Sequence, residues 1–261
     1  MDRHDRAARR ARLRLIGIGV VAGAVIAVGG VAVVRGMSDD GKDGKPAASP
    51  TVVPTATAST GPATSASPSA TKTLTPNTAK PVHLNKPTGQ KDGASIGFPR
   101  FGFGAMSAAV YHLDELSVLD DDMVRRQLAV TTAKGSEASI DKAVSEVRKL
   151  RETVGLPSSG GTPAGMTIST NVDAAQAWAL DDDGLVINVW MHYSRTATLP
   201  KAASDDSPLK NQLTDVVLIW EDGDWKITTD PKWVAKRFTP APYNPDSPTS
   251  LKDGWLVVIR D

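Results

Sequence analysis

An uncharged apolar segment of twenty residues, 15–34, constrains this chain more than any other feature. A helix rises about 1.5 Å per residue, so a helix of this length spans about 30 Å, the thickness of the hydrocarbon core of a bilayer. Six arginines precede the segment in residues 1–14, whereas acidic and basic residues are mixed after Arg35. The positive-inside rule therefore predicts a single-pass cell-membrane protein with a basic cytoplasmic tail (1–14), a transmembrane helix (15–34) and an extracytoplasmic remainder.

A cleaved signal peptide is the alternative for this segment, but it requires a shorter apolar region and an A-x-A-like cleavage site, and neither is present. Gly19, Gly23 and Ala27 recur every fourth residue and would allow two transmembrane helices to approach closely. These three residues are candidates for self-association, so a homo-oligomer is one expectation. The Arg-rich tail is expected to contact anionic lipid.

Residues 35–93 are predicted to form a disordered linker. Between residues 46 and 79, 28 of 34 residues are Ser, Thr, Pro or Ala. Such a stretch buries too little apolar surface to offset the entropy lost on ordering it. The linker would hold residues 94–261 away from the membrane, and its Ser, Thr and Pro content is compatible with O-glycosylation.

The net charge of +1 conceals two parts of opposite sign. Residues 1–95 have 13 basic and 6 acidic side chains (+7), whereas residues 96–261 have 17 and 23 (−6). An acidic extracytoplasmic domain disfavours nucleic acid as its partner. The chain has no Cys, which excludes disulfides, thiolate metal sites and cysteine nucleophiles, and only His112 and His192 lie outside the tail and linker. We expect neither a metal nor a cofactor.

The sequence from 94 to 261 predicts an extracytoplasmic α+β domain. Apolar residues at helical spacing predict three helices. The first covers 104–118, the second begins after a cap at Asp120, and the third runs from a cap at Ser139 to Val154. Alternation predicts strands over 166–178, 185–193, 213–221 and 225–229, with Asp222-Gly223 as a hairpin turn. A short helix over 231–237, irregular structure through the prolines 240–248 and an apolar strand over 255–259 complete the prediction. The last strand has no predicted position in the sheet.

Two motifs in this domain carry a family resemblance. Gly97-Phe98-Pro99-Arg100 after the linker, and the strand 216–220 continuing through Asp222-Gly223-Asp224-Trp225-Lys226, resemble a family of actinobacterial single-pass membrane proteins associated with integrative and conjugative elements. That family has no assigned biochemical activity. The order of three helices and then strands is similar to the nuclear-transport-factor-like cone, in which three helices pack on a curved antiparallel sheet.

The same cone fold occurs in bitopic assembly subunits of conjugation and type IV secretion systems. The resemblance thus implies a non-enzymatic structural or assembly component of such an apparatus, which contacts other envelope proteins through its extracytoplasmic domain. The alternative is an extracytoplasmic module that binds a small ligand or a cell-wall component. A cone-fold isomerase or dehydratase is less favoured; its candidate residues would be Tyr111, His112, Asp114 and His192.

One group of aromatic residues is a candidate pocket or groove. Side chains of this kind pack in cores or bind a partner segment or an apolar ligand. The Asp runs 120–122 and 181–183 fit helix caps and turns better than calcium ligands. The sequence has no P-loop, Rossmann fingerprint or nucleophile elbow, so we expect no enzyme activity. The pocket candidates are Trp178, Trp190, His192, Trp220 and Trp225.

Overall fold

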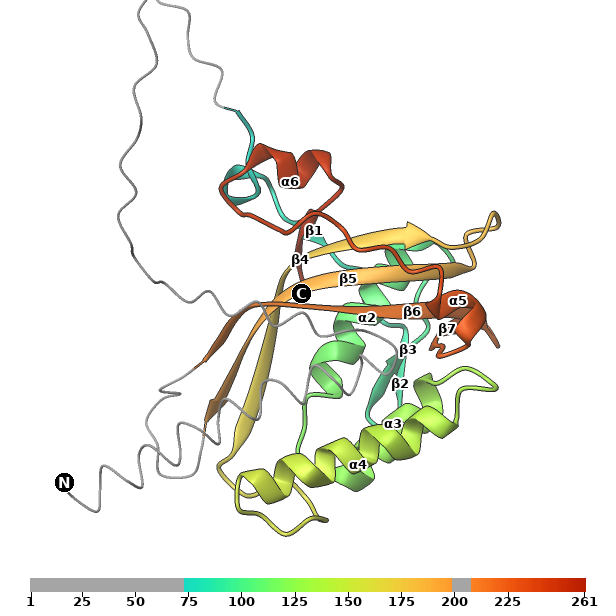
Figure 1. The fold of residues 1–261 in the computed structure, drawn as a ribbon, viewed down its shortest axis with the longest axis vertical. Helices are drawn as coiled ribbons and strands as arrows, with labels where there is room; N and C mark the ends of the chain where they lie inside the picture. Colours follow the sequence, from blue (N-terminus) through green and yellow to red (C-terminus); the bar gives the residue numbers. More distant parts are fainter. Residues whose placement is uncertain (1–72, 199–207) are drawn as a thin grey trace, which may run out of the picture. The chain divides into compact units, whose positions relative to one another are not determined.

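A computed structural model describes residues 73–198 and 208–261 (Figure 1). The predicted transmembrane segment, with Gly19, Gly23 and Ala27, lies outside these residues, as does most of the predicted linker. Within the described ranges, no helix has both the length and the apolar character needed to cross a membrane. The membrane span and its self-association therefore remain predictions from sequence.

The described residues form an α+β fold built on a six-stranded sheet of order β1-β8-β4-β5-β6-β7. Three long strands dominate it and bend along their length (Figure 1): β4 (Thr167–Ala179), β5 (Val186–Thr198) and β6 (Leu209–Glu221). The predicted antiparallel pairing is confirmed for β4 to β7 (Asp224–Ile227). The strand β8 (Leu256–Ile259), for which the sequence predicted no position, pairs antiparallel with β4. A wholly antiparallel sheet is wrong, because β1 (Val82–His83), within the predicted linker, pairs in parallel with β8 and makes the sheet mixed.

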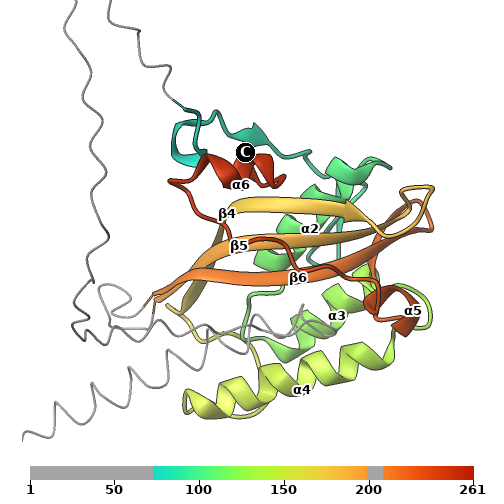
Figure 2. The ribbon, with the colours of Figure 1, turned by 45° about the horizontal axis from the view of Figure 1, so that its top comes forward.

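Three helices cover one face of this sheet (Figure 2). They are α2 (Gly102–Glu115), α3 (Asp121–Thr131) and α4 (Ala138–Thr153), and α2 contacts β4, β5, β6 and β7. The predicted Asp120 cap is confirmed, because its Oδ1 accepts a hydrogen bond from the Met123 N–H at 2.8 Å. The predicted Ser139 cap is wrong, because α4 begins at Ala138 and its cap position, Glu137, lies two residues before Ser139.

The two sequence motifs that carry the family resemblance contact each other. Asp224 accepts hydrogen bonds from the backbone N–H groups of Gly97 (2.9 Å) and Phe98 (3.3 Å). The Trp225 indole N–H donates to the Pro99 carbonyl at 2.8 Å. A Cβ atom on Gly104 would lie 1.9 Å from that carbonyl oxygen, so only glycine allows α2 to pass this close to the motif.

Regular structure begins before the predicted domain boundary at residue 94. A 3₁₀ turn, η1 (Pro76–Thr78), is followed by β1 and by a hairpin of β2 (Gly89–Lys91) and β3 (Ala94–Ile96). The Asn77 N–H donates to the Pro245 carbonyl at 3.0 Å, which ties this segment to the C-terminal part of the chain. The last third of the predicted linker therefore belongs to the folded domain.

The other face of the sheet is covered by the segment between β7 and β8, which crosses it in Figures 1 and 2. This segment contains α5 (Pro231–Val234) and α6 (Pro248–Lys252). The prediction that the prolines 240–248 exclude regular structure is wrong for Pro248, which is the first residue of α6. The N–H groups of the first helical turn make no hydrogen bond within the helix, so a proline at this position removes none. Trp255 follows with 0% exposure, and its indole N–H donates to the Ala241 carbonyl at 3.0 Å. Other parts of the chain thus pack on both faces of the sheet.

Candidate functional site

The five residues of the predicted aromatic pocket do not form one site. Cross-strand pairing places Trp178, Trp190 and His192 on the face beneath the C-terminal segment. Trp220 and Trp225 lie on the opposite face, which packs against the helices, and their ring centroids are 5.3 Å apart. The sheet separates the two groups, so no common groove exists between them.

The two tryptophans under the C-terminal segment hold that segment in place. The Trp190 indole N–H donates to the Phe238 carbonyl at 2.7 Å. The Trp178 ring lies 5.1 Å from the Phe238 ring, centroid to centroid, and remains 56% exposed. Packing against a crossing segment is their main role, and only Trp178 presents a large aromatic surface to solvent.

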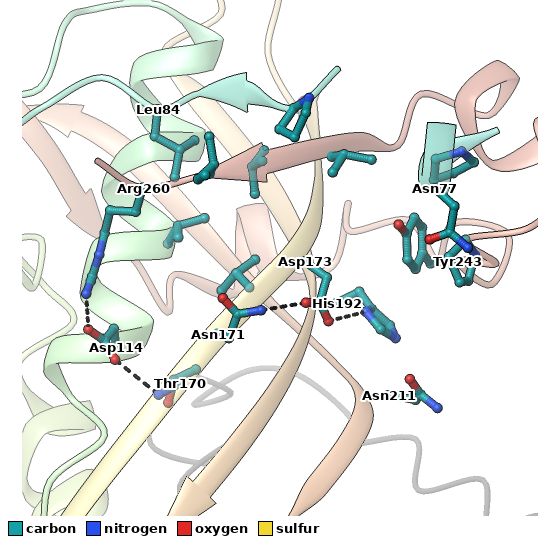
Figure 3. A pocket seen from close by; sticks show the side chains of 18 of the residues that line it. Asn77, Leu84, Asp114, Thr170, Asn171, Asp173, His192, Asn211, Tyr243 and Arg260 are labelled. Atoms are coloured by element: carbon teal, nitrogen blue, oxygen red, sulfur yellow. Dashed lines mark hydrogen bonds and ion pairs between the residues drawn. The ribbon is translucent and has the colours of Figure 1, made fainter. Parts of the chain in front are cut away.

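A cleft opens between β4 and β8 (Figure 3) and has a volume of about 670 Å³. The two strands pair only at Ala174↔Val257 and Ala175↔Leu256. A bulge at 172/174 bends β4 away, while β8 continues along β1. Residues 169–173 and 257–260 therefore form the two walls of the cleft, with side chains of α2 behind them.

Asp114 of α2 bridges the two walls at one end of the cleft, as the dashed lines in Figure 3 show. Its Oδ2 atom lies 2.6 Å from Nη2 of Arg260, just after β8. Its Oδ1 atom accepts a hydrogen bond from the backbone N–H of Thr170 on β4 at 3.3 Å. The Arg260 guanidinium also lies 5.1 Å from the centroid of the Tyr111 ring, which supports its position.

His192 lies toward the other end of the cleft. Its Nδ1 atom is 3.3 Å from Oδ2 of Asp173, but in a geometry that makes no hydrogen bond, and it has no other hydrogen-bond partner among the described residues. Asp173 accepts a hydrogen bond from the Asn171 amide at 2.6 Å. The His192 ring packs 4.7 Å from the Tyr243 ring. Burial and the nearby Asp173 charge raise the pKa of Tyr243.

Of the four residues considered for acid–base chemistry, only Asp114 and His192 line the cleft. Tyr111 supports Arg260 from outside it, and His112 is buried, with its Nδ1 3.7 Å from Oε2 of Glu115. Burial raises the pKa of Glu115, but His112 and hydrogen bonds from Ser95 outweigh burial and hold that pKa below its ordinary value. His112 and Glu115 thus form a structural cluster beneath β3.

The Asp runs have structural roles, as the sequence indicates. Asp120 caps α3, and Oδ1 of Asp181 accepts hydrogen bonds from the N–H groups of Leu185 (2.9 Å) and Val186 (3.0 Å) in the β4–β5 turn. Across residues 73–198 and 208–261, no three His, Asp or Glu side chains lie close enough together to hold a metal ion.

Arg195 of β5 is a buried cation that sequence reasoning missed. It is 2% exposed, and it donates to Oγ1 of Thr170 at 2.9 Å and to Oγ of Ser117 at 2.7 Å. Its Nη1 atom has no hydrogen-bond partner in the described part of the chain, and burial lowers the pKa of this side chain. Arg195 follows the predicted strand 185–193, and an arginine at such a position is expected to be exposed. No sequence signal therefore indicates that it is buried.

The described residues define a class of domain: an α+β fold with three helices on one face of a mixed sheet and a cleft between two diverging strand edges. In comparison with known proteins, the chain matches no family model, no curated protein and no solved structure at a significant level. Its function is therefore inferred from the sequence and the cleft.

Proposed function

We propose that this chain is a non-enzymatic, membrane-anchored component of a conjugal-transfer or secretion apparatus, and that its extracytoplasmic domain binds other envelope proteins through the β4–β8 cleft. The observation that most supports this is the composition of the cleft walls. Two stretches of strand backbone, 169–173 and 257–260, face each other across it. Exposed strand edges are a common means by which proteins bind other polypeptides.

The predicted topology agrees with this proposal. A basic tail, one apolar span and a linker would place the domain outside the membrane, as in the bitopic assembly subunits that the sequence resembles. Three helices followed by the antiparallel run β4–β5–β6–β7 is the element order of the nuclear-transport-factor-like cone. We assign the domain to that fold as part of the proposal, and transfer of function from it is by analogy.

Site-specific photo-crosslinking in cells that carry the complete element would test this function. A photoreactive residue replaces Asn171, which is exposed and lines the cleft, and the matched control replaces Gln90, an exposed residue of β2 outside it. The expected result is a crosslink from position 171, and not from position 90, to an envelope protein encoded by the same element. A crosslink to no protein, or equal crosslinking from both positions, contradicts the proposal.

A module that binds a small ligand or a cell-wall component is the second candidate. The cleft volume of about 670 Å³ lies within the range of small-molecule pockets, roughly 300–1,000 Å³. Soluble cell-wall fragments that raise the melting temperature of the chain, but not that of an Asn171→Trp variant, would favour this candidate over the first. An isomerase is not proposed, because Asp114 already bridges Arg260 and Thr170.

A further inference from the structure

We infer that the cleft binds its partner by strand insertion: an extended segment of a partner polypeptide, about four or five residues long, enters between β4 and β8 and extends the hydrogen-bonded sheet across the gap. This inference rests on the proposed function, because it assumes that the cleft binds protein. It adds the mode of binding and the chemistry of the partner segment.

The first wall has backbone groups that face the cleft. The Thr170 N–H donates to Asp114, on the side away from β5. In a strand, the N–H and C=O of one residue point to the same side, and the next residue points to the other side. The backbone groups of Val172 therefore face the cleft as those of Thr170 do. The pairing of β4 with β8 begins only at Ala174, so none of the described strands lies beside this wall.

The second wall has the same property. The Leu84 N–H donates to the Ile259 carbonyl at 3.0 Å, so Ile259 faces β1. Alternation then turns the backbone groups of Val258 and Arg260 toward β4. The pairing of Ala174 with Val257 uses the Val258 N–H, so the Val258 carbonyl and the backbone groups of Arg260 face the cleft. Because β4 and β8 are antiparallel, an inserted strand would run parallel to one wall and antiparallel to the other.

Hydrogen-bond complementarity identifies the occupant as a polypeptide. Backbone groups of Thr170 and Val172 on one wall face the Val258 carbonyl and the Arg260 backbone on the other, and a peptide strand presents N–H and C=O groups on both of its sides, with a rise of about 3.3 Å per residue. The walls comprise five residues of β4 and four residues from β8 onward, 169–173 and 257–260. An inserted segment of five residues would be about 16 Å long.

The side chains around the cleft define the character of this segment. Leu84 and Val110 line the cleft and are apolar, which favours apolar residues at every second position. The charge of Asp114 is already paired with that of Arg260, and Asp173 accepts a hydrogen bond from the Asn171 amide. The segment therefore needs no charged residue to pair with Asp114 or Arg260. When no partner segment is bound, the Thr170 N–H donates to Asp114. This long hydrogen bond would break when the segment inserts.

The test uses linear peptides as the probe and the full chain in detergent micelles as the target. A phage-displayed library of random 12-residue peptides is selected on the chain after depletion on the Asn171→Trp variant, which blocks the cleft. The Gln90→Trp variant is the matched control and should bind the selected peptides as the unmodified chain does. Equal melting temperatures of the two variants exclude a folding defect as the cause of any difference.

Backbone N-methylation of the selected peptide then reports the binding mode. Successive N–H groups of an inserted strand contact opposite walls, so methylation at either of two adjacent central residues should weaken binding about tenfold, the loss of one backbone hydrogen bond. Methylation at the peptide ends should have little effect. If methylation weakens binding only at every second central amide, the peptide adds to the edge of one wall. If methylation weakens binding at no central amide, the peptide docks through its side chains.

Either of these last two results overturns strand insertion and leaves the proposed function intact. If no cleft-dependent peptide is selected while position 171 crosslinks to an envelope protein in cells, strand insertion is also overturned. If both experiments are negative, the proposed function fails together with the inference. Only equal dependence on adjacent central amides supports insertion between the two walls.

Discussion

The carboxylate of Asp121 at the start of α3 provides a quantitative prediction of stability against pH. The side chain is 0% exposed, and it accepts hydrogen bonds from the Gly160 N–H (2.9 Å), the Ser159 hydroxyl (2.9 Å) and Nε of Arg148 (2.7 Å). Burial alone would raise the pKa, but these partners together lower it from 3.8 to about 2. The carboxylate thereby fixes the loop after α4 to the start of α3.

This lowered pKa corresponds to about 2 kcal/mol of stability, since one pKa unit is worth about 1.4 kcal/mol. Arg148 is 45% exposed, so solvent screens its part, and the two loop donors contribute most of the effect. Because the folded pKa lies below the unfolded one, the contribution is complete above about pH 4 and is lost as the pH falls toward 2.

Asp121→Asn should therefore lower the free energy of unfolding by about 2 kcal/mol at pH 7, with a difference from the parent that narrows below pH 4. Urea unfolding of both chains at a series of pH values from 7 to 2 measures this difference. Asp122→Asn is the matched control, because Asp122 is exposed on the same helix turn, and it should change stability little. A difference between Asp121→Asn and the parent that stays constant over this pH range would refute the reasoning.

Three further predictions concern packing, buried charge and topology. Gly104→Ala should destabilise the domain by more than about 2 kcal/mol in urea unfolding, because its Cβ would overlap the Pro99 carbonyl, whereas Gly102→Ala, with no atom within 4 Å, should be neutral or stabilising. The free energy of unfolding of Arg195→Met should stay within about 1 kcal/mol of that of the parent. The change removes a buried cation, and the Thr170 and Ser117 hydroxyls remain hydrogen-bonded to each other. A loss of stability above about 3 kcal/mol would contradict this. In the Cys-free chain, Gln90→Cys should react with an impermeant maleimide on intact cells and Ala7→Cys only after lysis; the reverse pattern would contradict the predicted orientation.

Local chemistry made much of the fold predictable. The Asp120 cap and the Asp222-Gly223 turn are specified by a few neighbouring residues, and both are present, with Asp222 and Gly223 at positive φ. Alternation on β5 correctly placed Asn188, Trp190 and His192 on one face. Short strands gave no such signal: β1 and β2 together comprise five exposed residues in a Pro- and Thr-rich context.

The candidate pocket failed because of the register between β5 and β6: Trp190 pairs with Asp215, so Trp220, five residues further along β6, lies on the opposite face, together with its cross-strand partner Trp225. The position of Trp178 depends on β4. Unbroken alternation from Val172 would place Trp178 on the helix-facing side. The bulge between Val172 and Ala174 inserts one residue and reverses every later side chain, so Ala175 faces the helices and Trp178 faces away. The same bulge bends β4 from β8 and opens the cleft. A bulge depends on tertiary packing, so periodicity in one sequence could not locate the cleft.

Amide hydrogen exchange of the full chain, with and without a selected peptide, tests most directly whether the cleft binds an extended polypeptide. The account predicts slower exchange at Thr170, Val172 and Arg260, whose N–H groups face the cleft, and unchanged exchange on the exposed strand β2. Exchange at these three amides that is unchanged at saturating peptide would contradict it.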